Sequence, residues 1–208
     1  MEALSNYYKI VKCNIKLLRV PIGISLIYVL LSKLFFDFKM QNASYVSSFC
    51  EMYLSVVGIF IFNGLIMIEE ENRIQEICYI KPISQFKIVI IRVGIMIFTN
   101  VLLFGLILAY VKYEQAQIRI IYFLVGAFIT ALFLGTIEMT VSTIFKNNIL
   151  GLCCSIFIYI INFFGGEKLL GKLYLFTLIN NHYERKLIFL IISIVLLVAN
   201  VLYLKKKF

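Results

Sequence analysis

Six apolar runs constrain the fold of this chain more than any other feature of its sequence. The runs cover residues 20–36, 48–68, 86–110, 118–144, 149–164 and 187–204. A helix needs about 20 apolar residues to cross the hydrocarbon core of a bilayer, and most of the runs approach that length. The apolar residues do not alternate with polar ones, as they do in the strands of a membrane barrel. The sequence therefore predicts an all-α, polytopic membrane protein with six transmembrane helices in one domain, residues 1–208.

Composition and charge agree with a membrane protein. The chain is 62% hydrophobic, has a mean hydropathy of +0.96 and carries only 15% charged residues, which is too apolar for a soluble domain of this length. The net charge of +9 comes from basic residues between the apolar runs and at the two ends of the chain. That placement suits anionic lipid headgroups, and no soluble segment is long enough to carry a nucleic-acid surface.

The first nineteen residues predict an amphipathic helix, with its cations on one face and its apolar residues on the other. Lys9, Lys12, Lys16 and Arg19 follow one another at intervals of three or four residues. Leu4, Tyr8, Val11, Ile15 and Leu18 recur at similar spacings. A helix with these two faces is expected to lie in the membrane interface over residues 2–19. The alternative is an ordinary extension of the first transmembrane helix.

The fifth run is the shortest, and the segment after it, residues 165–186, is too polar to cross a bilayer and too hydrophobic for an ordinary loop. We expect a re-entrant or interfacial hairpin here, with bends at Gly165, Gly166 and Gly171. Six spans place both termini on one side. That side carries twelve lysines and arginines and the other carries eight, so the positive-inside rule predicts that both termini are cytoplasmic.

The most charged stretch of the chain, residues 69–84, joins the second and third runs. Its Glu69 and Arg73 are four residues apart, Ile74 and Ile77 share a helical face, and Pro82 ends the pattern. This spacing predicts a short cytoplasmic helix that presents apolar side chains among charged ones for docking into a partner. The alternative is a solvated loop whose acidic residues keep the turn in water.

An acidic run after the second span, followed by a short helix that closes on Lys81, Pro82, Ile83 and Ser84, resembles type-2 ABC exporter permeases. The whole chain is similar to that family: it has the amino-terminal helix, six spans, a short inner turn at residues 145–148 and the outer hairpin. One departure is that Ile74 and Gln75 stand where the family has a glycine and a threonine.

The resemblance implies the membrane-spanning subunit of an ATP-driven exporter in a bacterial cell membrane. Such a subunit is not catalytic by itself and holds no cofactor, since two copies of a separate ATPase bind ATP and Mg²⁺. A second permease copy or a homologous permease completes the complex, and amphipathic peptides, toxins or bacteriocins are the expected cargo. The residues expected to dock the ATPase are Glu69, Glu70, Glu71, Arg73, Ile74, Glu76, Ile77, Lys81 and Pro82. The alternative function is a membrane immunity or sensor protein that binds a partner without transport.

Two motifs point to chemistry that the rest of the chain does not support. Residues 166–172 match the glycine and lysine positions of a phosphate-binding loop, but Leu173 replaces the Ser or Thr that binds Mg²⁺. Glu69, Glu70 and Arg73 resemble the motif of CAAX-type intramembrane proteases, but their spacing differs by one residue, and His182 lies outside the apolar runs. Five cysteines, of which Cys153 and Cys154 are adjacent and three are isolated, and a single histidine predict neither a disulfide framework nor a metal site.

Glu138 and Arg92 are the two charged residues placed deepest in the predicted spans. Glu138 lies in the fourth run, seven residues before Phe145, and Arg92 lies in the third run at a comparable depth. Charges in lipid are costly, so we predict an intramembrane ion pair that fixes the packing of the two helices. Contact of Glu138 with substrate, or extension of its side chain to the inner surface, are the alternatives.

Overall fold

The computed structural model describes residues 2–39, 41–65, 85–114, 116, 119–178 and 183–207, and this part of the chain is helical without strands. Its elements are α1 (Glu2–Leu17), α2 (Arg19–Phe35), α3 (Ala43–Ser48), a π-helix (Phe49–Leu54), α4 (Val56–Phe62), α7 (Gln85–Tyr113), α8 (Ile120–Phe145), α9 (Asn148–Leu170), a 3-10 turn (Gly171–Leu173) and α10 (Glu184–Lys207). Among the described residues, five helical segments are long and apolar enough to cross a membrane, or six if the bent pair α1–α2 counts as one span. The predicted all-α, multi-pass membrane fold is confirmed.

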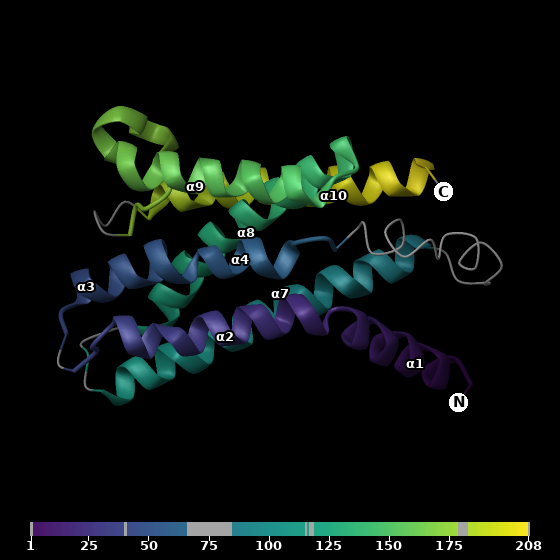
Figure 1. The fold of residues 1–208 in the computed structure, drawn as a ribbon, viewed down its shortest axis with the longest axis horizontal. Helices are drawn as coiled ribbons and strands as arrows, with labels where there is room; N and C mark the ends of the chain where they lie inside the picture. Colours follow the sequence, from purple (N-terminus) through teal and green to yellow (C-terminus); the bar gives the residue numbers. More distant parts are fainter. Residues whose placement is uncertain are drawn as a thin grey trace.

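The amino-terminal helix meets α2 at a bend of 57°. Leu18 occupies the bend and is fully buried, while Lys12 and Lys16 on α1 and Arg19 at the start of α2 are exposed. The amphipathic helix predicted over residues 2–19 is therefore a separate element, which diverges from the bundle where α2 enters it (Figure 1).

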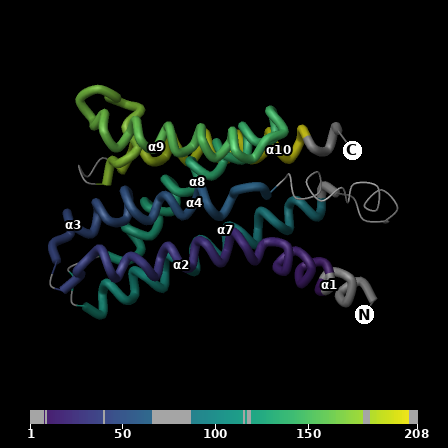
Figure 2. Tube along the Cα trace, in the orientation of Figure 1, coloured from purple at the N-terminus to yellow at the C-terminus, as the bar shows by residue number. Residues whose placement is uncertain are grey.

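The central helix of the bundle is α8. It lies between a layer formed by α9 and α10 and a second layer formed by α2 and α7, while α3 and α4 run beside it (Figures 1 and 2). Both termini lie at one end of the bundle, and α4 ends and α7 begins at that same end (Figure 1). We call this the terminal end, and the other the hairpin end.

Small residues let α4 and α8 pack closely. A Cβ added to Gly58 would lie 2.0 Å from the carbonyl oxygen of Ala131, and one added to Gly135 would lie 2.8 Å from the carbonyl oxygen of Gly58. Ala127, Ala131 and Gly135 follow one another at four-residue intervals and are buried. Small residues at this spacing allow two membrane helices to approach backbone to backbone, where dispersion contacts replace the hydrophobic driving force.

The ends of two helices differ from the predicted ones. The second span begins at Ala43, earlier than predicted, and its helix ends at Phe62 because Gly64 takes a φ of 69°. The fifth helix continues to Leu170, but Gly166 interrupts it with a φ of 61° and a ψ of 177°. Gly166 and Gly171 both have positive φ, as expected for bends, whereas Gly165 remains helical.

Candidate functional site

A buried ion pair at the hairpin end joins two segments that are far apart in sequence. Lys186 Nζ lies 2.5 Å from Glu51 Oε1, and both side chains are completely buried. The ammonium also donates to Thr130 Oγ1 at 2.5 Å and to the carbonyl of Leu175 at 2.6 Å. Because an ammonium has three donors, these three acceptors satisfy Lys186 completely.

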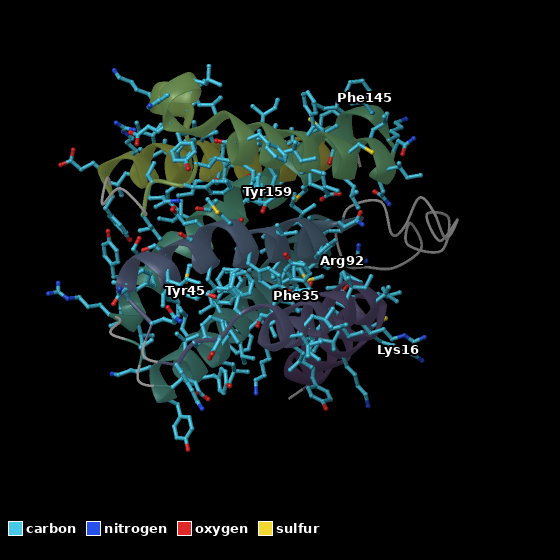
Figure 3. All side chains as sticks on the ribbon, turned by 60° about the vertical axis from the view of Figure 1, so that its left-hand side comes forward. Lys16, Phe35, Tyr45, Arg92, Phe145 and Tyr159 are labelled. Atoms are coloured by element: carbon cyan, nitrogen blue, oxygen red, sulfur yellow. The ribbon has the colours of Figure 1, made fainter. Side chains whose placement is uncertain are left out.

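Glu51 belongs to a widened turn of its helix. Residues Phe49–Leu54 form the π-helix, whose carbonyl groups bond across a wider turn than those of an α-helix. Phenol groups from other helices reach two of them: Tyr159 donates to the carbonyl of Met52 at 2.5 Å, and Tyr28 donates to that of Tyr53 at 3.3 Å. Tyr159 reaches from α9 across the bundle interior (Figure 3). A π-turn is therefore tolerated here because neighbouring helices satisfy its backbone.

The second carboxylate oxygen of Glu51 holds the chain between α9 and α10. Glu51 Oε2 accepts a hydrogen bond from the backbone nitrogen of Leu178 at 2.9 Å, and Asn162 Oδ1 accepts one from Leu175 at 2.9 Å. Residues 174–178, which we call the inserted segment, are buried against Ile59, Ile129 and Phe189. The predicted hairpin is thus neither a span nor a surface loop at this point, because its backbone enters the protein interior and finds polar partners there.

The outer part of the hairpin is held more loosely. Arg185 pairs with Glu167 at 2.5 Å, and both side chains are about 30% exposed. Exposed pairs of this kind contribute at most about 1 kcal/mol. Tyr174 lies nearby, and its burial raises the pKa of its phenol. The charges of Glu51 and Glu167 raise this pKa to a smaller degree, so the phenol stays neutral at physiological pH. The anchoring of the hairpin therefore depends on Glu51, Lys186 and Asn162.

Gly126 makes room on α8 for the inserted segment. A Cβ added at Gly126 would lie 2.3 Å from Leu178 Cδ1. We expect Gly126→Val to displace Leu178 and expose the fully buried Thr177. In a background without native cysteines, maleimide labelling of Thr177→Cys should accelerate at least about tenfold, the factor that accompanies a loss of 1.4 kcal/mol in closure. Gly105→Val is the control, because the nearest atom to its Cβ would be 3.9 Å away. Equal labelling rates in the Gly126→Val and Gly105→Val proteins would contradict the packing of Leu178 against Gly126.

A second polar cluster lies toward the terminal end of α8. Glu138 is fully buried and accepts a hydrogen bond from Ser142 Oγ at 3.1 Å. Gly151 on α9 packs directly against Ser142. The cluster therefore packs α8 against the start of α9. Asn147 begins α9 by accepting a hydrogen bond from Ile149 at 2.9 Å, as an N-cap does.

The structure does not place Arg92 against Glu138, so the predicted ion pair is replaced by two separate contacts. Arg92 Nε donates to Asn14 Oδ1 at 2.7 Å, which ties α7 to α1, and Figure 3 shows Arg92 on the α1 side of the bundle. Glu138 instead bonds Ser142 on its own helix, and its backbone lies against Gly151 of α9. Equal depth in two predicted helices did not determine which faces of the helices meet.

The residues predicted to dock an ATPase, 69–82, lie outside the described residues, as does His182. Within the described ranges, no group of three His, Cys, Asp or Glu side chains could hold a metal ion, and Cys13, Cys50, Cys153 and Cys154 are free thiols. Residues 166–172 form the kinked end of α9 and the 3-10 turn, which differs from a phosphate-binding loop between a strand and a helix.

Sequence reasoning missed the Glu51–Lys186 pair. Glu51 lies inside the predicted run 48–68 and Lys186 ends the predicted hairpin, and neither was considered as a site residue. A signal was present, since an acidic residue within an apolar run requires a partner. No family model, curated protein or solved structure matches the chain.

Proposed function

We propose that this chain is the membrane-spanning permease subunit of an ATP-driven exporter. The observation that carries the proposal is the bond between Asn14 and Arg92 at the terminal end. It fastens the amphipathic helix α1 to α7, the helix that follows the acidic segment 69–84. A force applied to that segment by a partner would therefore act on α7 and α1 together.

In this proposal the terminal end is cytoplasmic, in agreement with its larger number of lysines and arginines. Two ATPase subunits bind ATP and Mg²⁺ there and engage residues 69–82. A second permease copy or a homologous permease completes the pathway, and substrate enters from the cytoplasm or inner leaflet. Amphipathic peptides are the cargo class we propose, by analogy with similar small exporters. The inserted segment closes the hairpin end and must withdraw when substrate leaves.

Co-purification from the native host tests the proposal. The tagged protein, solubilised in mild detergent, is expected to retain in stoichiometric amount an ATPase that has a complete phosphate-binding loop. The double change Glu70→Lys and Glu71→Lys should release this ATPase, because like charges then face a surface complementary to glutamates. Asp37→Lys, an exposed charge reversal in the loop at the hairpin end, is the matched control and should retain it.

Two results would contradict the exporter. The protein could be recovered alone under conditions that preserve known transporters, or with a partner that lacks ATPase motifs. The second result would favour the membrane immunity or sensor function. If the protein with Glu70→Lys and Glu71→Lys retained the ATPase, the docking site would lie outside residues 69–82.

A further inference from the structure

A groove between α7 and α10 opens on the outside of the bundle. It has a volume of about 300 Å³ and is lined by Ile90, Val93, Leu197, Val198, Val201 and Leu202. Ile90, Val198 and Leu202 are each about half exposed. The volume is at the lower end of the range for small-molecule sites. Since α7 and α10 are membrane spans, an exposed groove on these helices faces the acyl chains of the bilayer.

The residues that line the groove belong to the first turns of α7 and the last turns of α10. These two helix ends lie at the terminal end of the bundle (Figure 1). Lys87 is exposed and precedes Ile90 by three residues, which places the two on neighbouring positions of one helical face. On α10, Lys205, Lys206 and Lys207 follow Leu202 within two turns. Both helices that form the groove thus carry cations where they approach the membrane surface. Lysines at such positions extend to the headgroup layer.

We propose that this groove binds an anionic phospholipid of the leaflet at the terminal end. One acyl chain occupies the apolar groove, and the exposed Lys87 at its rim contacts the phosphate. Basic residues beside an intramembrane groove on the cytoplasmic side are the chemistry that retains acidic lipids. A second copy of the chain fits less well, because a twofold interface through the groove would bury Lys87 of both copies against apolar side chains. The site does not depend on the export function.

Native mass spectrometry of protein purified from nanodiscs with equal phosphatidylglycerol and phosphatidylcholine tests the site. We expect phosphatidylglycerol to be retained preferentially. Lys87→Gln should lower its retention about fivefold, the effect of one lysine at an anionic membrane surface. Val198→Phe should lower retention of both lipids by filling the groove. The matched controls are Lys112→Gln, at the other end of α7, and Val195→Phe, on α10 outside the groove, since both residues are exposed.

Equal retention of the two lipids by the unmodified protein would overturn the site. So would unchanged retention in both Lys87→Gln and Val198→Phe. Leu202→Phe provides a second groove variant in case Val198→Phe does not fold, and elution as a single symmetric peak on size exclusion establishes folding for each variant. Because Lys87 is exposed, its substitution tests the headgroup contact without disturbing the packing of the bundle.

Discussion

Lys186→Met is expected to destabilise the protein by about 3–5 kcal/mol, the cost of leaving one member of a buried ion pair alone. The substitution leaves the Glu51 carboxylate without the ammonium that lies 2.5 Å away in an interior that excludes water. It also removes the donor to Thr130 and to the Leu175 carbonyl. The inserted segment would then lose its anchor at the Leu175 carbonyl, and the hairpin end should open first.

The melting temperature of the detergent-purified protein, followed by fluorescence size exclusion, measures this effect. At about 2–4 °C per kcal/mol for a chain of this size, Lys186→Met should lower it by roughly 10 °C. Arg185→Met is a closely matched control, because the neighbouring cation pairs with Glu167 near the surface and contributes at most about 1 kcal/mol. A similar shift in both variants would mean that the buried pair is no more important than the exposed one.

A double variant separates charge from packing. Glu51→Gln with Lys186→Met removes both charges and keeps a side-chain carbonyl that can accept from Leu178 N. If the uncompensated carboxylate causes the loss, the double variant should be more stable than Lys186→Met alone. If the double variant instead loses as much stability as the two single variants together, the effect comes from side-chain shape or hydrogen bonding.

The membrane fold was predictable because it depends on properties that are local in sequence. Run length predicts a span, the two faces of residues 2–19 predict a separate helix, and Gly166 and Gly171 predict bends. The structure confirms each of these. None of them requires knowledge of which helices are neighbours.

The polar contacts were not predictable because they depend on helix rotation and on distant pairing. Glu51 and Lys186 are brought together by the return of the hairpin into the bundle, which no local pattern encodes. Arg92 and Glu138 were paired by depth alone, yet each faces a different neighbour. Depth along a helix follows from the 1.5 Å rise per residue, whereas the face that meets a partner depends on packing. The docking residues at 69–82 stay a prediction.

Gly58→Ala is the second substitution with a large expected effect, although it adds a single methyl group. The new Cβ would lie 2.0 Å from the Ala131 carbonyl oxygen and 2.7 Å from its Cα. Backbone atoms cannot rotate away as a flexible side chain can, so α4 and α8 must separate. Separation forfeits contacts along the whole interface, and we expect a loss of about 3 kcal/mol or more, at the upper end for overpacking.

Gly94→Ala is the matched control on another membrane helix, because nothing lies within 4 Å of its added Cβ. There the substitution should be neutral or stabilising by up to about 1 kcal/mol, since alanine is the better helix former. The same thermal measurement therefore compares one methyl group at a closed interface and at an open one. A Gly58→Ala protein as stable as Gly94→Ala would require α4 and α8 to pack less closely than the structure places them. The small residues at Ala127, Ala131 and Gly135 would then no longer be explained by the approach of α4.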